Sequence, residues 1–279
     1  MTLREFYAEE IEATCGIRNA ALVRAFADMP RERFLGPGPW LVKGEGDLFG
    51  PARATPDADP KRVYHNVAIA IDPARMLFNG APGVLATWFD ALELRPGHAV
   101  LHVGCGTGYY SAILAATVGA AGSVEAIDVD QALAARAREA LAPWPWIQVR
   151  HGDGRAHGSA FNAVVINAGA THVRASWLDA LAPGGRLVIP LTVSLPPGSP
   201  IGKGLVMLIT RTADGYDARV LGMVAIYNAE GMRDPALEQK LGLAVRAGDF
   251  VSVRRLRRDP HGEGAGCWLH GPDFCLSRA

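Results

Sequence analysis

The segment 99–109 joins a short apolar run to three glycines, and residues of these types suit the binding of a ligand close to the backbone. Gly104, Gly106 and Gly108 lack a Cβ atom, so the chain can turn sharply there and a ligand can approach it closely. Asp128 ends the next apolar run, roughly 20 residues after the last glycine, where a carboxylate can accept hydrogen bonds from both hydroxyls of a ribose. The pattern therefore predicts a site for a ligand that contains a nucleoside.

The spacing of the glycines discriminates between such ligands. A dinucleotide site uses G-x-G-x-x-G, which seats a pyrophosphate at the start of a helix, whereas this turn is G-x-G-x-G. A cofactor without a pyrophosphate is favoured, and S-adenosylmethionine offers an amino acid to lie along the turn and a ribose for Asp128. The alternative is a tight turn with a structural role. Cys105, inside the turn, is interpreted as a small side chain, or as a reactive thiol if it is exposed beside the helix start.

The elements that position this turn alternate along the chain. Strands are expected at 99–103, 123–128, 146–150, 162–167 and 186–191, and helices at 108–118, 130–141 and 173–181. The alternation predicts an α/β fold, Rossmann-like and doubly wound, with a mostly parallel sheet and helices on both of its faces. After Pro190, the longer runs 204–210 and 219–227 suit antiparallel strands at the sheet edge. The charges of the second helix, on Arg136, Arg138 and Glu139, are expected on its solvated face.

Three segments are expected along the chain: an N-terminal helical region with a Gly/Pro-rich loop (1–62), a cofactor-binding core (63–230) and a C-terminal extension (231–279). The first contains two helices separated at Gly16, then an irregular loop or lid over 33–61. The positions expected to be buried in these helices are Phe6, Ile11, Leu22, Val23 and Phe26. A strand at 63–71 and a helix at 83–92 lead into the core. The extension, with a helix from Asp234 and an Arg-rich strand, either caps the active site or forms a dimer contact.

Composition limits the classes of partner. The 279 residues are 49% hydrophobic and 20% charged, with 28 basic and 28 acidic residues and a formal net charge of zero. This balance gives no net positive charge that would attract nucleic acid or an anionic membrane. The N-terminal residues carry acids and lack a continuous apolar run, so neither a signal peptide nor a membrane span is expected. We expect a cytoplasmic protein, and the oligomeric state stays open.

The four cysteines are Cys15, Cys105, Cys267 and Cys275. They form no C-x-x-C pair and have no histidine at the usual zinc spacing, so no metal site is predicted. Cys267 and Cys275 could pair in principle, although an intracellular chain would keep them reduced.

Several motifs in this order resemble the protein-L-isoaspartate O-methyltransferase family, a class I S-adenosylmethionine-dependent methyltransferase family, over about 25–192. They are Ala25-Phe-Ala-Asp-Met-Pro-Arg-Glu-Arg-Phe34, Leu94-Arg-Pro-Gly97, Val100-Leu-His-Val-Gly-Cys-Gly-Thr-Gly-Tyr-Tyr110, His151-Gly-Asp-Gly154, Phe161-Asn-Ala-Val-Val-Ile-Asn-Ala168 and Leu181-Ala-Pro-Gly-Gly-Arg-Leu-Val-Ile-Pro190. The family's fold and activity are expected here because these motifs match those of the family in both order and spacing.

The resemblance implies a role for each matching residue. The three glycines would border the methionyl part of the cofactor, Asp128 its ribose and Asp153 the amino group of its adenine. Asp153 is alternatively a turn residue. Asn167, at the end of its strand, would face the point of methyl transfer or would cap the strand. The residues expected to bind the cofactor are His102, Gly104, Cys105, Gly106, Thr107, Gly108, Asp128, Val129, Asp153, Gly154 and Asn167.

The chain departs from the family at two places. The family has an acid where His102 stands, and a histidine buried in the core is the favoured interpretation over a catalytic base. The segment 76–86 replaces the family's T-I-S-Q-P-x-x-V-A substrate element, with Gly80 at the position of its serine. Asn79 either supplies a replacement donor or belongs to an Asn-Gly turn. Asn79, Gly80 and Asn167 are therefore the expected residues of the acceptor side.

The expected activity is methyl transfer to a carboxylate of a protein or peptide. A carboxylate is already nucleophilic, so positioning and exclusion of water would suffice without a general base. An amine or hydroxyl acceptor would need a base, for which His65 and His102 are the candidates. Two alternatives stay open: a specialised relative that methylates a biosynthetic peptide or a small metabolite, and a cofactor-binding module without catalysis.

Overall fold

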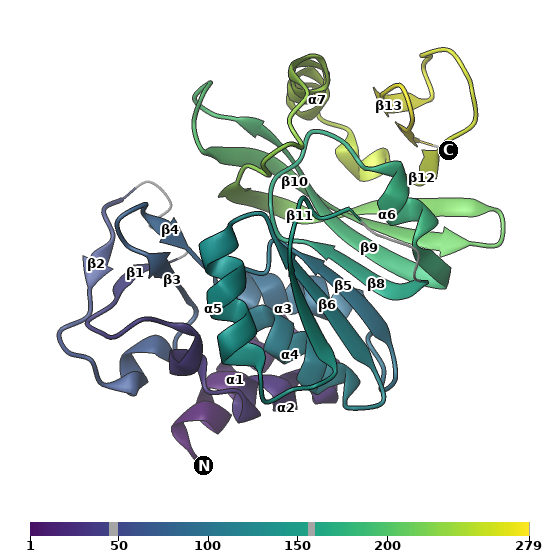
Figure 1. Cartoon of the computed structure of the whole chain (residues 1–279). Helices are drawn as coiled ribbons and strands as arrows, with labels where there is room; N and C mark the ends of the chain where they lie inside the picture. Colours follow the sequence, from purple (N-terminus) through teal and green to yellow (C-terminus); the bar gives the residue numbers. More distant parts are fainter. Residues whose placement is uncertain (45–49, 156–159, 279) are drawn as a thin grey trace. The chain divides into compact units, whose positions relative to one another are not determined.

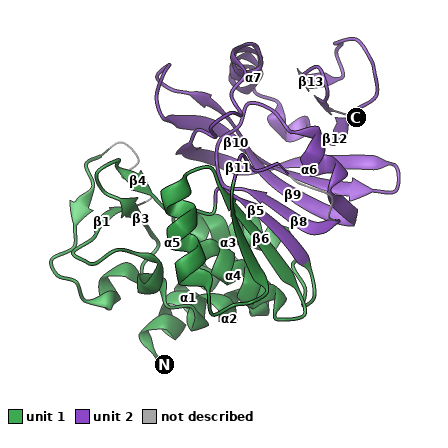
Figure 2. Ribbon diagram, viewed as in Figure 1, with its two compact units in different colours: residues 1–98, 105–151 green, residues 99–104, 152–279 purple. Residues whose placement is uncertain are grey.

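A computed structural model of the chain describes residues 1–44, 50–155 and 160–278. The chain divides into two compact units, coloured separately in Figure 2. Unit 1 comprises Met1–His98 and Cys105–His151, and unit 2 comprises Ala99–Gly104 and Gly152–Ala279. Each unit is therefore discontinuous in sequence. The predicted glycine turn crosses from unit 2 to unit 1 at the peptide bond between Gly104 and Cys105.

Unit 1 contains the helices α1 (Leu3–Cys15), α2 (Ala20–Asp28), α3 (Pro82–Ala91), α4 (Tyr109–Val118) and α5 (Gln131–Leu141), together with 3-10 turns at Arg31–Phe34 and Pro60–Val63. Helix α1 packs against α2 and α3, and α2 packs against α4 (Figure 1). Thr2 and Glu5 form a capping box at the start of α1, and Gly16 ends the helix with φ +65°. The predicted break at Gly16 is confirmed.

Two sets of strands complete unit 1. Strands β6 (Ser123–Asp128) and β7 (Ile147–His151) pair in parallel, with Asp128 opposite His151. The other set is a small antiparallel sheet in the order β2 (Arg53–Ala54), β1 (Leu41–Gly44), β3 (Val67–Asp72) and β4 (Leu77–Phe78). The prediction of an irregular loop over 33–61 was therefore wrong in part, because β1 and β2 pair within it. Residues 45–49 of that loop lie outside the described residues.

Aromatic rings and one buried arginine fill the middle of unit 1. Arg31 is 0% exposed, and its guanidinium donates hydrogen bonds to the carbonyls of Val63, His65 and Val67 at 2.6, 3.0 and 2.7 Å. Its Cζ lies 5.6 Å from the ring centroid of Tyr109. Arg31 belongs to the motif at 25–34, and its hydrogen bonds connect that motif to residues 63–67, which lead into β3.

Unit 2 is a sheet that changes from parallel to antiparallel. Strand β8 (Phe161–Ile166) pairs in parallel with β5 (Ala99–Val103) and with β9 (Leu181–Ser194). From β9 onward the sheet is antiparallel, through β10 (Ile201–Thr212), β11 (Gly215–Tyr227), β12 (Arg255–Arg257), β14 (Cys275–Ser277) and β13 (Cys267–His270). The predicted antiparallel edge is confirmed, and it includes strands of the C-terminal extension.

Two helices pack on strands of unit 2. The short helix α6 (Ala175–Asp179) and the longer α7 (Pro235–Ala247) both pack against β9. The carboxylate of Glu238 on α7 accepts a hydrogen bond from the backbone N–H of Ser194 at 2.5 Å. Leu241 of the same helix is 0% exposed. The C-terminal extension therefore belongs to the core of unit 2.

Several predicted bounds and positions differ from the structure. The helix predicted at 173–181 is only Ala175–Asp179, because the chain joins β9 at Leu181, opposite Phe161. Strand β9 runs to Ser194, beyond the predicted 186–191, because β10 pairs with it up to that residue. Phe6 is 54% exposed, since the buried face of α1 is formed by Tyr7, Ala8 and Ile11. None of the helices within the described residues is long and apolar enough to cross a membrane.

Candidate active site

Asp128 and the glycine turn are linked directly within unit 1. Asp128 ends β6 and is 7% exposed. Its Oδ2 accepts a hydrogen bond from the backbone N–H of Gly106 at 2.7 Å, and its Oδ1 accepts one from Asp130 N–H at 2.9 Å. Burial raises the pKa of this carboxyl, while the two N–H donors lower it by favouring the charged form. A carboxylate has about four acceptor positions, so both oxygens can still accept from ribose hydroxyls.

The second half of the turn leads into α4, in which every residue except Ala116 is buried. Gly108 is the N-cap of α4 with φ +97°, a backbone conformation that side chains with a Cβ rarely adopt. A Cβ at Gly108 would lie 2.8 Å from Cδ1 of Leu141 on α5, so glycine is also required for close packing. Thr107 is 4% exposed. The turn thereby ends at the start of a helix, where the first backbone N–H groups have no acceptor within the helix and can bind an anionic group.

Cys105 has no features of a reactive thiol. It is 4% exposed, and its backbone N–H donates to the carbonyl of Ile127 at 3.1 Å. Burial, and then the charge of Asp128, raises the pKa of the thiol far above its usual range. Of the two interpretations of Cys105, the small buried side chain is the one that the structure supports.

In unit 2, Asn167 holds the first part of the turn. It follows β8, and its backbone N–H donates to the carbonyl of Val103 at 2.8 Å. Its side-chain Nδ2 donates to the carbonyl of Gly104 at 3.3 Å. A Cβ at Gly104 would lie 3.1 Å from the carbonyl oxygen of Asn167. Asn167 therefore positions Gly104 from the end of its strand, and its placement at the point of methyl transfer stays a prediction.

Asp153 and Gly154 also lie in unit 2, in the loop after β7. The carboxylate of Asp153 forms ion pairs with Arg155 at 2.8 Å and with Arg174 at 3.6 Å, and its side chain is 47% exposed. Gly154 accepts a hydrogen bond from Trp177 Nε1 at 2.8 Å, and a Cβ at Gly154 would lie 2.3 Å from Cγ1 of Val103. Gly154 is thus packed tightly against β5, while the carboxylate of Asp153 remains accessible.

His102 lies in the middle of β5 and is 0% exposed. Burial lowers its pKa to about 3, so the imidazole is neutral at ordinary pH. A general base needs a pKa closer to the working pH, so the structure supports a core histidine. His65, the other candidate base, is an exposed residue whose carbonyl is held by Arg31.

Asn79 and Gly80 lie between β4 and α3 in unit 1. The backbone N–H and the side-chain Oδ1 of Asn79 both bond to Ile69 of β3, at 2.9 Å each. Its Nδ2 is buried and has no hydrogen-bond partner among the described residues. The carbonyl of Gly80 accepts from the hydroxyl of Tyr110, and a Cβ at Gly80 would lie 2.3 Å from Cδ2 of Leu85. Asn79 is thus held in place by Ile69, and its Nδ2 remains a donor without a partner among the described residues. Leu85 fills the space that a side chain at position 80 would need.

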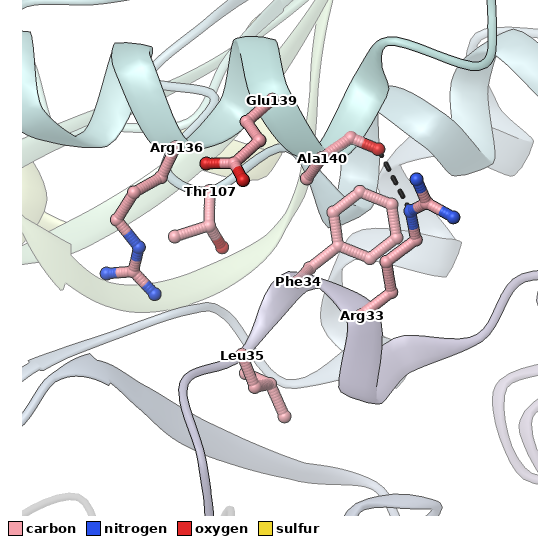
Figure 3. A pocket seen from close by; sticks show the side chains of 7 residues that line it. All are labelled: Arg33, Phe34, Leu35, Thr107, Arg136, Glu139 and Ala140. Carbon is pink, nitrogen blue, oxygen red and sulfur yellow. Dashed lines mark hydrogen bonds between the residues drawn. The ribbon is translucent and has the colours of Figure 1, made fainter.

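A cavity of about 330 Å³ lies next to the turn in unit 1 (Figure 3). Its lining comes from the 3-10 turn at Arg31–Phe34, from Thr107 and from one face of α5: Arg33, Phe34, Leu35, Thr107, Arg136, Glu139 and Ala140. Arg33 Nε donates to the carbonyl of Ala140 at 3.1 Å, as Figure 3 shows. Arg136 donates to the carbonyl of Ile71 at 2.6 Å. The prediction of a merely solvated face for Arg136 was therefore wrong, because β3 lies within reach of its guanidinium.

Of the predicted cofactor residues, Thr107 alone lines this cavity, so the cavity adjoins the turn without including Asp128. Val129, which follows Asp128, is 43% exposed. Its carbonyl lies 3.0 Å from Nε2 of His151 at the end of β7. This contact joins the carboxyl ends of β6 and β7 beside the predicted ribose site. Nothing about Val129 or His151 in the sequence indicates it.

Comparison with known proteins shows to which family this chain belongs. The model of the family described as protein-L-isoaspartate(D-aspartate) O-methyltransferase matches residues 54–196. A protein-L-isoaspartate O-methyltransferase from Methylorubrum populi is 34% identical over 214 residues, which are 75% of this chain and 86% of that protein. One from Pseudomonas aeruginosa is 43% identical over 172 residues, which are 58% of this chain and 74% of that protein. The chain belongs to the protein-L-isoaspartate O-methyltransferase family.

Solved structures show the same fold. A protein-L-isoaspartate O-methyltransferase superimposes with a TM-score of 0.67 at 19% identity, over 87% of this chain and 69% of the other. A second, from Plasmodium falciparum and in complex with S-adenosyl-L-homocysteine, gives 0.61 at 15% identity, over 82% of this chain and 99% of the other. The predicted Rossmann-like α/β fold is confirmed. As a member of this O-methyltransferase family the chain is an enzyme, and β10, β11 and the C-terminal extension lie beyond the match to the family model.

Proposed function

We propose that this chain transfers the methyl group of S-adenosylmethionine to the carboxylate of an L-isoaspartyl residue in a protein or peptide. The names of the relatives give the acceptor and the methylated atom, and the Plasmodium falciparum neighbour binds the demethylated cofactor. The observation that carries the proposal is the buried carboxylate of Asp128 bonded to Gly106 of the glycine turn.

The residues of the turn fit this cofactor. Gly104, Gly106 and Gly108 all have positive φ, and a Cβ at any of them would press on a neighbouring residue, so glycine gives the turn its shape. Asp128 suits the ribose hydroxyls, and Asp153 suits the exocyclic amine of adenine, since a carboxylate accepts from both kinds of donor. When bound, S-adenosylmethionine supplies an electrophilic methyl group on a positively charged sulfur.

The reaction needs little acid–base chemistry from the protein. A carboxylate oxygen of the acceptor forms a bond to the methyl carbon while the carbon–sulfur bond breaks, and its electron pair remains on sulfur. No proton is removed in this step, which agrees with the neutral, buried state of His102. The task of the side chains is to orient the acceptor and to exclude water.

Asn79 is the residue we assign to the acceptor carboxylate. Its Oδ1 is held by Ile69, so its Nδ2 has one fixed direction and is buried without a partner among the described residues. A buried donor without a partner costs about 1–3 kcal/mol, and a substrate oxygen would satisfy it. Asn79 can thus replace the hydroxyl that the family carries at the position of Gly80.

The experiment is methyl transfer from radiolabelled S-adenosylmethionine to an isoaspartyl peptide and to the matching aspartyl peptide. We expect base-labile label in the isoaspartyl peptide alone. Asn79→Ala should raise KM for the peptide about tenfold or more while cofactor affinity stays the same, because the change removes a hydrogen bond to the acceptor.

The control variant is Thr87→Ala, an exposed residue of α3 whose hydroxyl bonds only within its own helix. Label in neither peptide, with cofactor binding intact by calorimetry, would contradict the isoaspartyl acceptor. An unchanged KM for Asn79→Ala would contradict the role of Asn79 alone.

A second candidate is a relative specialised for a biosynthetic peptide or a small metabolite. The observation in its favour is the packing of Leu85 into the space beside Gly80, which gives the turn a shape different from one that carries a serine. Transfer to a carboxylate of another peptide or metabolite, with no transfer to the isoaspartyl peptide, would favour this candidate. The cytoplasmic location stays a prediction.

A further inference from the structure

Four side chains with metal-binding atoms meet in the C-terminal extension, within unit 2. His261 lies in the loop between β12 and β13, Cys267 and His270 lie at the two ends of β13, and Cys275 begins β14. One ligand atom from each of the four lies within 4.8 Å of the other three. Both cysteines are free thiols. Nothing in the proposed methyl transfer uses these residues.

The distances match a tetrahedral metal site. The Sγ of Cys267 lies 3.8 Å from Nε2 of His261 and 3.9 Å from Nδ1 of His270. Zn–S bonds of about 2.3 Å and Zn–N bonds of about 2.0–2.1 Å separate neighbouring ligand atoms of a tetrahedron by about 3.4–3.8 Å. We propose that His261, Cys267, His270 and Cys275 bind one Zn²⁺ ion as a structural site of the C-terminal extension.

The orientation of His261 supports this assignment. Its Nδ1 lies 2.8 Å from the backbone carbonyl of Asp259, which can only accept a hydrogen bond, so Nδ1 carries the proton. The carboxylate of Asp259 lies 3.4 Å from the same nitrogen. Nε2 therefore carries no proton, and its lone pair faces Sγ of Cys267 at 3.8 Å. Histidines that bind metals are usually held in this way, by an oxygen acceptor on the other ring nitrogen.

The ligand set identifies both the metal and its role. Two thiolates and two neutral imidazoles are typical of zinc, and their charge of −2 balances the ion. All four positions are taken by protein, so no position is open for a substrate, which is typical of a structural site. The ion would join the loop that contains His261 to β13 and β14, whose side chains Trp268, Leu269 and Leu276 are themselves buried.

A disulfide between Cys267 and Cys275 is the competing use of these residues. Residue pairing between β13 and β14 places Cys275 opposite His270, and Cys267 opposite Ser277. A disulfide would use neither histidine, whereas the two imidazole rings lie with centroids 4.9 Å apart beside the thiols. Zinc accounts for all four side chains.

The first test is the metal content of the full chain, purified without a polyhistidine tag under reducing conditions and analysed by mass spectrometry for metals. We expect about one zinc per chain. Cys267→Ser and His261→Gln should each lower the bound zinc at least tenfold after dialysis. The matched controls Cys15→Ser and His65→Gln, which lie in unit 1, should retain it. No zinc in the unmodified chain after growth with added zinc, or equal loss in ligand and control variants, would overturn the proposal.

The second test uses the unmodified chain, so that it does not depend on the folding of a variant. Removal of zinc with a chelator should expose Cys267 to a thiol reagent, and added Zn²⁺ should restore its protection. Co²⁺ in place of Zn²⁺ should give the visible absorption of tetrahedral cobalt with thiolate ligands. A Cys267–Cys275 disulfide in the protein isolated without reductant, or octahedral cobalt absorption, would contradict the zinc site.

Discussion

Asp128 combines two tasks in one carboxylate. It accepts hydrogen bonds from the backbone of Gly106 and Asp130, so it shapes the glycine turn before any ligand arrives. The same oxygens remain the acceptors for a ribose. Loss of this side chain should therefore disturb both the turn and the ligand, and its effect on binding should exceed that of one hydrogen bond at an exposed site.

Asp128→Ala is expected to weaken the binding of S-adenosylhomocysteine by about 1–3 kcal/mol, because the ribose hydroxyls lose their acceptor. Titration calorimetry measures this change. Asp217→Ala, which removes a carboxylate that is 58% exposed on β11, is the control and should bind normally. Equal affinity for the two variants would refute the assignment of Asp128 to the ribose.

His102 makes the stability of the fold depend on pH. Burial lowers its pKa to about 3 in the folded chain, while an exposed histidine has a pKa of about 6.5. Below pH 6.5 the unfolded chain binds a proton that the folded chain does not, so this contribution to stability is present above pH 6.5 and is lost as the pH falls.

Replacement of His102 by Gln should remove this dependence. Between pH 7.5 and 5.5, the free energy of unfolding in urea should fall about 1 kcal/mol further for the unmodified chain than for His102→Gln. The exposed His65→Gln should behave like the unmodified chain. The same pH dependence in all three proteins would show that His102 titrates normally in the fold.

The glycine turn, the position of Asp128 at the end of its strand and the burial of His102 could be predicted from the sequence, because each depends on residues within one or two elements. The contacts that side chains make over long distances could not. The amphipathic pattern of α5 predicts a solvated Arg136, and only the folded chain shows Ile71 beside it. The four ligands in the extension were missed because five, two and four residues separate them in the order His, Cys, His, Cys, unlike the common zinc patterns.

At the scale of elements, Arg31 joins the N-terminal motif to the chain before β3. Its guanidinium is buried and donates hydrogen bonds to three backbone carbonyls, those of Val63, His65 and Val67. The prediction of a loop over 33–61 overlooked β1 and β2 because strands of four and two residues are too short to show alternation. Arg31 bonds to the carbonyl of Val67, which pairs with Gly44 of β1, and residues so far apart in the sequence give no local sign of this arrangement.

Arg31→Met should lower the free energy of unfolding by about 3 kcal/mol or more, because the carbonyls of Val63, His65 and Val67 lose their donors. Arg33→Met, two residues away and exposed, should cost less than about 1 kcal/mol. Unfolding in urea, followed by circular dichroism, measures both. A similar loss for the two variants would mean that the carbonyls have found other donors.

At the scale of the whole molecule, the C-terminal extension is part of a folded unit. Helix α7 packs on β9, and β12 extends the sheet from β11 at Tyr216 and Asp217. Leu241 and Leu243 of α7 provide a matched pair, because the first is 0% exposed and the second is 56% exposed.

Leu241→Ala should lower the free energy of unfolding by about 2–5 kcal/mol, since it leaves a cavity under α7. Leu243→Ala should change it by less than about 0.5 kcal/mol. The measurement is unfolding in urea for each variant beside the unmodified chain. A small effect of Leu241→Ala would mean that α7 unfolds separately from the rest of unit 2.

Residues 99–104 belong to unit 2, although the residues before and after them belong to unit 1. This arrangement affects the order in which the protein can fold on the ribosome. Strand β5 is synthesised before β6 and β7, yet it pairs with β8, whose residues 161–166 emerge much later. Asn167, which holds the carbonyl of Gly104, follows later still. The first part of the glycine turn therefore gains its contacts with β8 and Asn167 only after residue 167 has been synthesised.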